Sequence, residues 1–292
     1  MKRTKLVIVF PIYNGEKTML KSLKCVAEQE FRDFKGIILE NKSTDKTLKI
    51  AQEFCANDDR FEIIQNEEHL SAIDNFINAI QIGREHGEYF CLRACDDLST
   101  PDYFSKLVAA LDANPQKLLA AASTLTIDPD GPDFHKVPDP AVLTFWKQVS
   151  SGKIPKRLTF PSEWFYGVYR SDSEAADILC TRLPQLGSAW CAASYTVAEF
   201  VIRDFATWVE GPEFIFYRGS NSKDLYASKS ISTMLRQRIR YTVGCYRVLD
   251  KLPPLSARTR RLLFKCFWRD ARSKTNYRIR RHLKTRVLSA FS

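Results

Sequence analysis

Residues 6–51 read LVIVFPIYNGEKTMLKSLKCVAEQEFRDFKGIILENKSTDKTLKIA. Apolar runs at residues 5–10 and 36–39 are each followed by a helix-like pattern, at residues 16–29 and 45–55. Unbroken apolar runs of this length are typical of strands that are buried on both faces of a parallel sheet. The alternation of strand and helix patterns therefore predicts an α/β domain built around a parallel sheet.

The same alternation continues downstream, and the change of pattern after it suggests three segments. The further elements that we expect are strands at residues 61–64, 88–93 and 119–126 and helices at residues 72–85 and 101–113. We assign residues 1–110 to a ligand-binding half, residues 111–228 to the second half of the same domain, and residues 229–292 to a basic helical tail. Pro253 and Pro254 divide that tail into separate helices.

Three of the predicted strands end in polar loops, and ligands of open α/β sheets bind at the carboxyl ends of strands. After the first strand, the turn from Pro11 through Asn14 presents the ring of Tyr13, which could stack on a base, and backbone groups suited to a diphosphate. As a turn residue alone, Tyr13 would have no such role.

The second loop, Glu40-Asn41-Lys42-Ser43-Thr44-Asp45, offers acid and amide side chains that could accept a hydrogen bond from a base N–H. Residues 41–45 are equally suited to cap the helix that follows. The third loop carries Asp96 and Asp97, and adjacent carboxylates can hold a hard divalent cation such as Mg²⁺ or Mn²⁺. A cap for the helix that begins near Pro101 is the alternative for this pair.

With these motifs in place, the chain resembles a family 2 glycosyltransferase of the inverting, A-type nucleotide-sugar fold. The resemblance covers about residues 4–110 and rests on residues 6–51 together with NAIQIGREHGEYFCLRACDDLSTPDYF at residues 78–104. It implies a Rossmann-like, mostly parallel central sheet flanked by helices, a nucleotide-sugar donor with UDP favoured, and a divalent metal. It also implies a carboxylate base that deprotonates a hydroxyl of a glycan or lipid-linked acceptor in the synthesis of cell-surface polysaccharide or lipopolysaccharide.

The resemblance assigns roles to individual residues. Pro11 and Tyr13 would line the base pocket, and Asn41 would read the base. Asp96 would contact the ribose or the diphosphate, and Asp97 would bind the metal. In the second loop, however, Glu40 to Asp45 stand where the family has paired acids, and Ala94 replaces the first acid of the third motif.

The catalytic base is the largest departure from the family pattern. The segment Leu186-Gly187-Ser188-Ala189-Trp190-Cys191, where similar members carry an acid, has no carboxylate. Glu163 and Glu199 are the nearest candidates, and each could instead be a solvated surface residue. Arg170 and Arg218 could contact the diphosphate or an anionic acceptor, or serve in structural ion pairs. A non-catalytic nucleotide-sugar-binding or scaffold protein therefore remains the alternative to an enzyme.

The charge of the chain is concentrated in its tail. The 292 residues have a formal net charge of +10, and residues 229–292 alone hold 18 Lys and Arg against Asp250 and Asp270. Apolar residues recur there at helical spacing, so the tail could dock on the anionic inner face of a membrane. It could equally pack on the domain and leave a solvated basic face. We expect no nucleic-acid binding, because no recognised reading module surrounds these charges.

Composition and the start of the chain bear on location. The eight cysteines form no C-x-x-C pair, which favours free thiols in a reducing compartment. The apolar run after Lys2, Arg3 and Lys5 is shorter than a signal peptide requires, and no uninterrupted apolar stretch reaches the length of a membrane span. A cytoplasmic protein, with a peripheral membrane position left open, is therefore expected.

Overall fold

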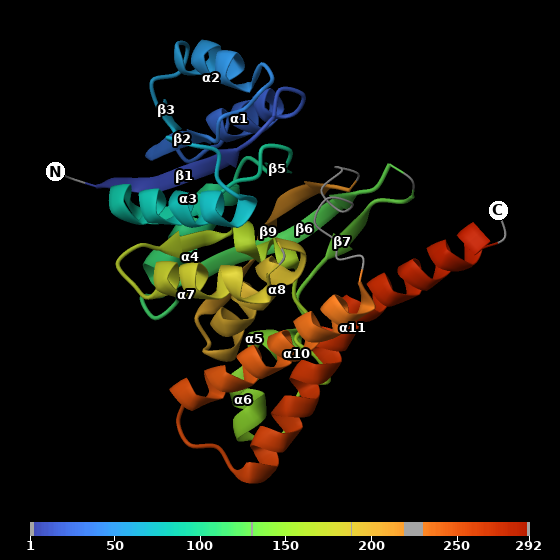
Figure 1. Ribbon diagram of the computed structural model, residues 1–292. Coiled ribbons are helices and arrows are strands. Elements are labelled where there is room, and N and C mark those ends of the chain that lie inside the picture. Colours follow the sequence, from blue (N-terminus) through green and yellow to red (C-terminus); the bar gives the residue numbers. More distant parts are fainter. Residues whose placement is uncertain (1–2, 130, 188, 219–229, 291–292) are drawn as a thin grey trace.

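The computed structural model describes residues 3–129, 131–187, 189–218 and 230–290, with the side chains of residues 189–190, 275–282 and 284–290 left out. Its centre is a nine-stranded mixed sheet with the strand order β3-β2-β1-β4-β8-β6-β9-β5, and β7 pairs with β6 (Figure 1). The strands are β1 (Thr4–Ile12), β2 (Phe34–Glu40), β3 (Phe61–Gln65), β4 (Gly87–Leu92), β5 (Leu98–Ser99), β6 (Leu119–Ile127), β7 (Phe134–Lys136), β8 (Val168–Arg170) and β9 (Ala206–Tyr217).

Helices flank the sheet on both faces, as Figure 1 shows for α1 and α3. The α-helices of the domain are α1 (Met19–Ala27), α2 (Thr47–Cys55), α3 (Ala72–His86), α4 (Tyr103–Ala113), α5 (Pro140–Leu143), α6 (Phe145–Ser150), α7 (Ala175–Arg182) and α8 (Ala189–Ile202). Short 3₁₀ helices are η1 (Ser162–Tyr166), η2 (Leu183–Leu186) and η3 (Leu249–Lys251), and the tail forms α10 (Ile231–Val248) and α11 (Ala257–Ala290).

The first half of the sheet confirms the predicted parallel arrangement. β1 pairs in parallel with β2 and β4, and β2 pairs in parallel with β3. Alternate residues of β1 face opposite sides: Ile8 and Phe10 pack in the cluster that contains α1, whereas Val7 and Val9 pack in the cluster that contains α3. Burial on both faces explains why these strands read as unbroken apolar runs.

The second half extends the same sheet with mixed pairing. β8 is antiparallel to β4 and β6, while β9 runs parallel to β6 with a register shift between Ala122 and Ser123. The two-residue strand β5, which begins directly after Asp97, pairs with the far end of β9. The loop that carries Asp97 is thereby fixed to both halves of the sheet.

The tail packs on the domain through part of its length. The rings of Tyr195 on α8 and Tyr241 on α10 lie 5.4 Å apart, and Leu263 and Phe267 of α11 belong to the same apolar cluster as Val7. Figure 1 shows α11 continuing past the domain towards the C-terminus. None of the helices in the described parts of the chain combines the length and apolar character that a bilayer crossing needs. All eight cysteines are free thiols, as predicted.

Candidate active site

The three polar loops meet at one cavity of about 540 Å³ beyond the carboxyl ends of β1, β2 and β4. The loops contribute Pro11 and Tyr13, Asn41, and Asp96 with Asp97. These residues follow three strands whose carboxyl ends share one sheet edge, and the structure brings them together, as predicted. The opposite wall is mostly apolar and comes from α3, η1, η2 and α8, with Phe76, Phe165, Leu183 and Ala192 among its residues.

Asp97 is the most unusual side chain of this cavity. It is only 2% exposed, and its Oδ1 has no hydrogen-bond partner. Burial and the neighbouring charge of Asp96 raise the pKa of Asp97 well above its usual range, the charge of Glu163 adds to the rise, and Arg93 opposes it. The carboxylate is not used to cap α4, whose N-cap residue is Asp102. The site thus keeps a carboxylate oxygen buried and uncompensated.

Arg93 is a site residue that the sequence analysis did not identify. Its side chain is fully buried beside the Asp97 loop, where Nη2 donates to Ser99 Oγ at 3.0 Å. The guanidinium lies 4.8 Å from the ring centroid of Phe214 on β9. Its Nε and Nη1 have no hydrogen-bond partner. Arg93 is the last residue of a predicted strand that is otherwise largely apolar. A charged residue in that position was the only signal that the sequence offered.

The residues present fit a divalent cation. Like charges on Asp96, Asp97 and Glu163 raise the free energy of the ionised site, and a cation at Asp97 Oδ1 would relieve both the repulsion and the missing contact. Among the residues that the structure describes, no three His, Cys, Asp or Glu side chains form a ready-made metal cluster. A metal with only one or two protein carboxylates, whose other positions take phosphate oxygens, matches this composition.

An aromatic pair forms the rim of the cavity. Tyr13 is 45% exposed, and its ring centroid lies 4.3 Å from that of His69. The Nδ1 atom of His69 is 3.1 Å from the backbone oxygen of Asn41, which holds the imidazole at the cavity. No motif spacing in the sequence links His69 to the site. His69 lies in the loop after β3, which is not one of the three loops that the sequence assigned to the site.

The side chain of Asn41 is already engaged. Its Oδ1 accepts hydrogen bonds from the Leu70 backbone N–H and from Asn66, both at 2.8 Å. Its Nδ2 donates to the Leu70 carbonyl at 2.9 Å. Asn41 therefore lines the cavity as predicted, but its amide holds the loop that carries His69, and both acceptor positions of its Oδ1 are already used.

The remaining donor-site candidates of the first two loops are held by hydrogen bonds within the second loop and between the two loops. Glu40 Oε1 accepts from the backbone N–H of Ser43 at 2.6 Å, and Asn14 Oδ1 accepts from that of Thr44 at 2.8 Å. Asp45 Oδ1 accepts from the Thr47 backbone N–H at the start of α2. Burial opposes ionisation of Glu40 and Asp45, but these hydrogen bonds outweigh it and hold the pKa of each below its usual range. Asp45 therefore closes a turn directly before α2, whose N-cap residue is Lys46 and has no side-chain capping hydrogen bond.

Neither arginine that the sequence suggested for the diphosphate lines the cavity. Arg170 pairs with Tyr89 near the start of β4, at the sheet edge away from Asp97, and its Nη2 donates to the Leu111 carbonyl at 2.7 Å. Arg218 forms an ion pair with Asp128 at 2.5 Å. Arg218 thus forms the structural ion pair that was the alternative, whereas Arg170 is held by backbone carbonyls and the Tyr89 hydroxyl.

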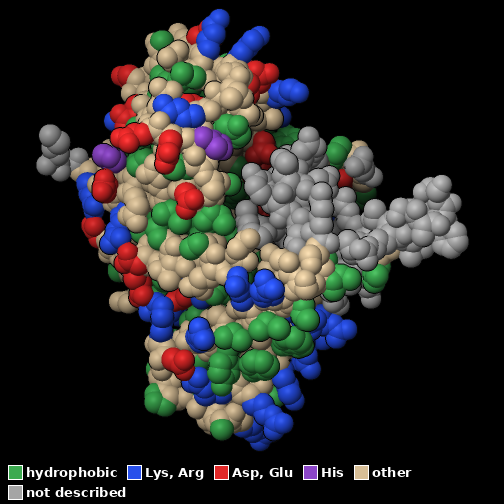
Figure 2. Space-filling model, viewed as in Figure 1, with side chains coloured by type: hydrophobic (Ala, Val, Ile, Leu, Met, Phe, Trp, Pro, Cys, Tyr) green, Lys and Arg blue, Asp and Glu red, His purple; other side chains and the backbone are tan. Residues whose placement is uncertain are grey.

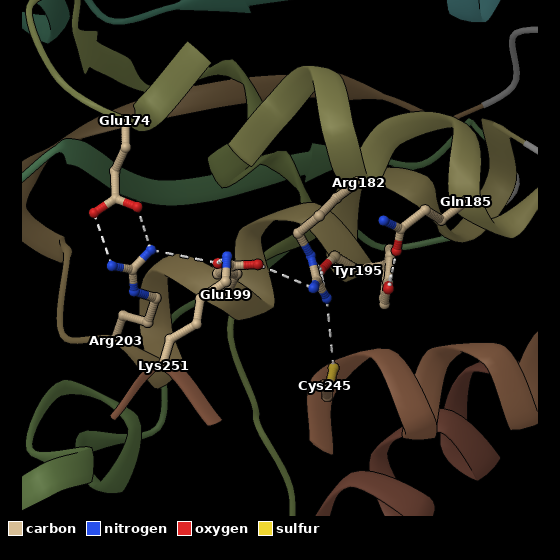
Figure 3. Close-up of polar contacts among 8 residues, drawn as sticks. All are labelled: Glu174, Arg182, Gln185, Tyr195, Glu199, Arg203, Cys245 and Lys251. Atoms are coloured by element: carbon tan, nitrogen blue, oxygen red, sulfur yellow. Dashed lines mark hydrogen bonds and ion pairs between the residues drawn. The ribbon is translucent and has the colours of Figure 1, made fainter. Parts of the chain in front are cut away.

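The two candidate bases have different surroundings. Glu199 on α8 is 2% exposed and binds Arg182 at 3.0 Å and Lys251 at 2.7 Å, away from the cavity (Figure 3). Glu163 on η1 accepts from Lys136 Nζ at 2.7 Å through Oε1, while its Oε2 is buried without a partner. Neither is a solvated surface residue, and only Glu163 is close enough to raise the pKa of Asp97. In the segment 186–191, Ser188 and the side chain of Trp190 lie outside the described residues.

Comparisons with known proteins agree with this architecture. The putative glycosyltransferase EpsE of Bacillus subtilis is 28% identical over 162 residues, which are 53% of this chain and 57% of that protein. The chain thus spans little more than half of this curated relative. Residues 1–349 of S. aureus TarS, solved in complex with UDP-GlcNAc, match with a TM-score of 0.59 at 16% identity over 85% of this chain and 72% of that chain.

A second solved structure, GalNAc-T7 with UDP, GalNAc and Mn²⁺, matches with a TM-score of 0.52 at 11% identity over 94% of this chain and 55% of that chain. At such identities the likeness shows the fold alone, which is the A-type glycosyltransferase fold implied by the sequence. The family model described as Glycosyl transferase family 2 matches residues 7–167, from β1 to the residue after η1. Because this match covers more than half of the chain, the chain belongs to glycosyl transferase family 2.

Proposed function

We propose that the chain is a metal-dependent, inverting glycosyltransferase that moves a sugar from a nucleotide diphosphate donor to a hydroxyl group. The observation that carries the proposal is the buried, unpartnered Oδ1 of Asp97 beside Asp96 in the cavity formed by the three loops. A bound Mn²⁺ or Mg²⁺ would supply counter-charge to the leaving diphosphate. Asp97 would hold the metal, and Asp96 would contact the ribose or the diphosphate.

The donor is proposed to be a UDP-sugar whose base lies at the rim of the cavity. Support comes from the exposed ring of Tyr13, its contact with His69, and the UDP-sugar in the TarS structure. Because the amide of Asn41 is bonded to Leu70, stacking and the backbone of the loops would recognise the base.

The acceptor would approach from the apolar wall. Phe76, Phe165 and Leu183 line that side of the cavity, which suits an acceptor with apolar parts, such as a lipid-linked glycan. In the reaction, the acceptor oxygen would attack the anomeric carbon while the bond to the diphosphate oxygen breaks, and the proton of the hydroxyl would pass to a carboxylate. We assign that role to Glu163, because Glu199 is fully occupied by Arg182 and Lys251.

The test is an assay of UDP-sugar turnover in Mn²⁺. The release of UDP is measured with and without candidate acceptors. Asp97→Asn should abolish both transfer and donor hydrolysis. Glu163→Gln should lower kcat by about 100-fold to 10,000-fold, the usual effect of losing a general base, while UDP still binds. Full turnover by the Asp97 variant would contradict the proposal.

A second candidate function is a non-catalytic protein that binds a nucleotide-sugar on the same fold. One observation favours it: neither Glu163 nor Glu199 is among the residues that line the cavity. This candidate predicts metal-dependent nucleotide binding without turnover of any donor, so the same assay separates the two.

A further inference from the structure

Helix α10 carries a second apolar face in addition to the one that packs on the domain. Tyr241 and Cys245 are buried in a core cluster that also contains residues of α8 and α11. Three other apolar residues point outward, with exposed fractions of 42% for Ile231, 46% for Leu235 and 47% for Ile239. Their four-residue spacing places them in one line along the helix. Among the residues that the structure describes, the domain therefore leaves this stripe exposed.

The stripe continues onto α11. Phe264 of α11 is 41% exposed, and its ring lies 5.6 Å from that of Tyr246 on α10. We call the four residues Ile231, Leu235, Ile239 and Phe264 the apolar tail face. Figure 2 shows hydrophobic side chains gathered over α10 and α11 in the lower part of the molecule, bordered by Lys and Arg.

The border of this face is strongly basic. Arg236 and Arg240 directly follow Leu235 and Ile239 in sequence and are exposed. The exposed basic residues of α11 in this region are Arg258, Arg261, Lys265, Arg269 and Arg272.

The acids of the tail do not offset these charges at the face. Residues 230–290 hold two acids, Asp250 and Asp270. Asp250 is bound to Arg260 at 2.6 Å, and Asp270 is buried and bound to Lys274 at 2.9 Å. The exposed charge around the apolar tail face is therefore positive.

We infer that the apolar tail face docks on the surface of an anionic phospholipid bilayer. Its apolar side chains would enter the boundary between headgroups and acyl chains, and the flanking arginines would contact the lipid phosphates, as in interfacial amphipathic helices. Each basic residue near such a surface contributes about 1 kcal/mol, so several together support reversible attachment. This inference goes beyond the proposed sugar transfer and does not depend on it.

Other occupants fit the same face less well. A second copy of the chain would bring two positive borders together, which like-charge repulsion disfavours. A nucleic acid would neutralise the arginines but leave Leu235 and Ile239 against a polar, charged backbone. An anionic bilayer is the surface that matches both the apolar stripe and its basic border.

The experiment is flotation of the full chain with vesicles of phosphatidylglycerol and phosphatidylcholine in equal parts, with pure phosphatidylcholine vesicles beside them. The wild-type chain should float with the anionic vesicles only, and added salt should weaken the binding through screening. We expect the ratio of vesicle-bound to free protein to fall at least about tenfold in the double variant Leu235→Ser/Ile239→Ser. The same fall is expected in a separate double variant, Arg236→Gln/Arg240→Gln.

Matched controls come from α1 and the turn before it, which carry an exposed leucine and exposed lysines far from the tail. Leu20 is 42% exposed, a fraction similar to the 46% of Leu235. Leu20→Ser should leave vesicle binding unchanged. Lys17→Gln/Lys24→Gln removes the same number of charges and should have little effect. Thermal melting of every variant confirms that each remains folded.

Three results would overturn the inference. The first is a wild-type chain that stays unbound with anionic vesicles at low salt. The second is equal binding by wild type and both tail variants. The third is binding of a single-stranded oligonucleotide that competes fully with the vesicles and depends on Arg236 and Arg240 but not on Leu235 and Ile239, which would assign the face to nucleic acid.

Discussion

At the scale of single residues, Asp97 lowers the stability of the metal-free fold. A buried carboxylate with one unpartnered oxygen and neighbouring negative charges destabilises the metal-free fold. The same features make a strong place for a cation and an anionic ligand. Such a trade between stability and binding is common where residues are kept for function.

We predict that Asp97→Asn stabilises the metal-free protein by about 1–3 kcal/mol, because the amide removes a buried negative charge that Arg93 and the backbone of Tyr217 offset only in part. The pH dependence has a definite sign. The pKa of Asp97 in the fold lies well above its ordinary value of 3.8, so the unfolded chain loses its proton first as pH rises, and the wild type loses stability relative to the variant. The extra stability of the variant should be absent at a pH below the ordinary pKa of 3.8 and should grow towards neutral pH.

Urea denaturation of both proteins at acidic and neutral pH, in EDTA, measures this difference. Added Mn²⁺ should reverse the order by stabilising the wild type alone. A variant that is less stable than the wild type at neutral pH in EDTA would show that Asp97 has compensating contacts.

Tyr13 should contribute to nucleotide affinity through its ring. Tyr13→Ala should weaken UDP binding about tenfold or more, because stacking on one base is worth about 1–3 kcal/mol, while Tyr13→Phe should bind as wild type. Calorimetry of the three proteins with UDP and Mn²⁺ checks this, and equal affinity of the alanine variant would remove Tyr13 from the base site.

The sequence predicts some of these residues better than others. Asp96 and Asp97 adjoin each other after an apolar run, so their place at the sheet edge follows from the strand alone. The engagement of Asn41 with Leu70 and the arrival of His69 depend on the conformation of another loop. Contacts between loops have no periodicity, and sequence patterns do not report them.

At the scale of elements, the parallel strands were predictable because burial on both faces leaves a continuous apolar run. The long strand β9 (Ala206–Tyr217) was not among the strands predicted from the sequence. Its sequence contains Glu210-Gly211-Pro212, with Gly211 at a φ of 107°. Gly and Pro inside a run normally mark a turn. Here they form the irregularity at which the pairing of β6 and β9 shifts register.

Helix α8 depends on the charge cluster around Glu199, shown in Figure 3. Glu199→Ala should destabilise the fold by about 3–5 kcal/mol, because it leaves Arg182 buried without its ion pair. Glu174→Ala is the matched control: its carboxylate binds Arg203 in the same cluster but is 44% exposed, so we expect a loss of no more than about 1 kcal/mol. Urea denaturation measures both. A loss for Glu199→Ala no larger than that of the control would mean that solvent reaches the cluster.

At the scale of the whole molecule, α8 and η2 connect the cavity to the tail. Ala192 and Leu183 line the cavity, whereas Tyr195 contacts Tyr241 and Glu199 binds Lys251 on the tail side. The basic tail was predictable from its charge and its helical spacing. Its packing on the domain was one of two alternatives that the sequence left open, because an amphipathic pattern indicates that a face is buried but not by which partner.

The central claim is a metal-dependent nucleotide site built on Asp97, and calorimetric titration tests it most directly. UDP, GDP, CDP and dTDP would each be titrated into the wild type and into Asp97→Asn, once with Mn²⁺ and once with EDTA. The account predicts that UDP binds the wild type in Mn²⁺ and that this binding is lost in EDTA and in the variant. Failure of all four nucleotides to bind the folded wild-type protein in Mn²⁺, or equal binding by the variant, would contradict it.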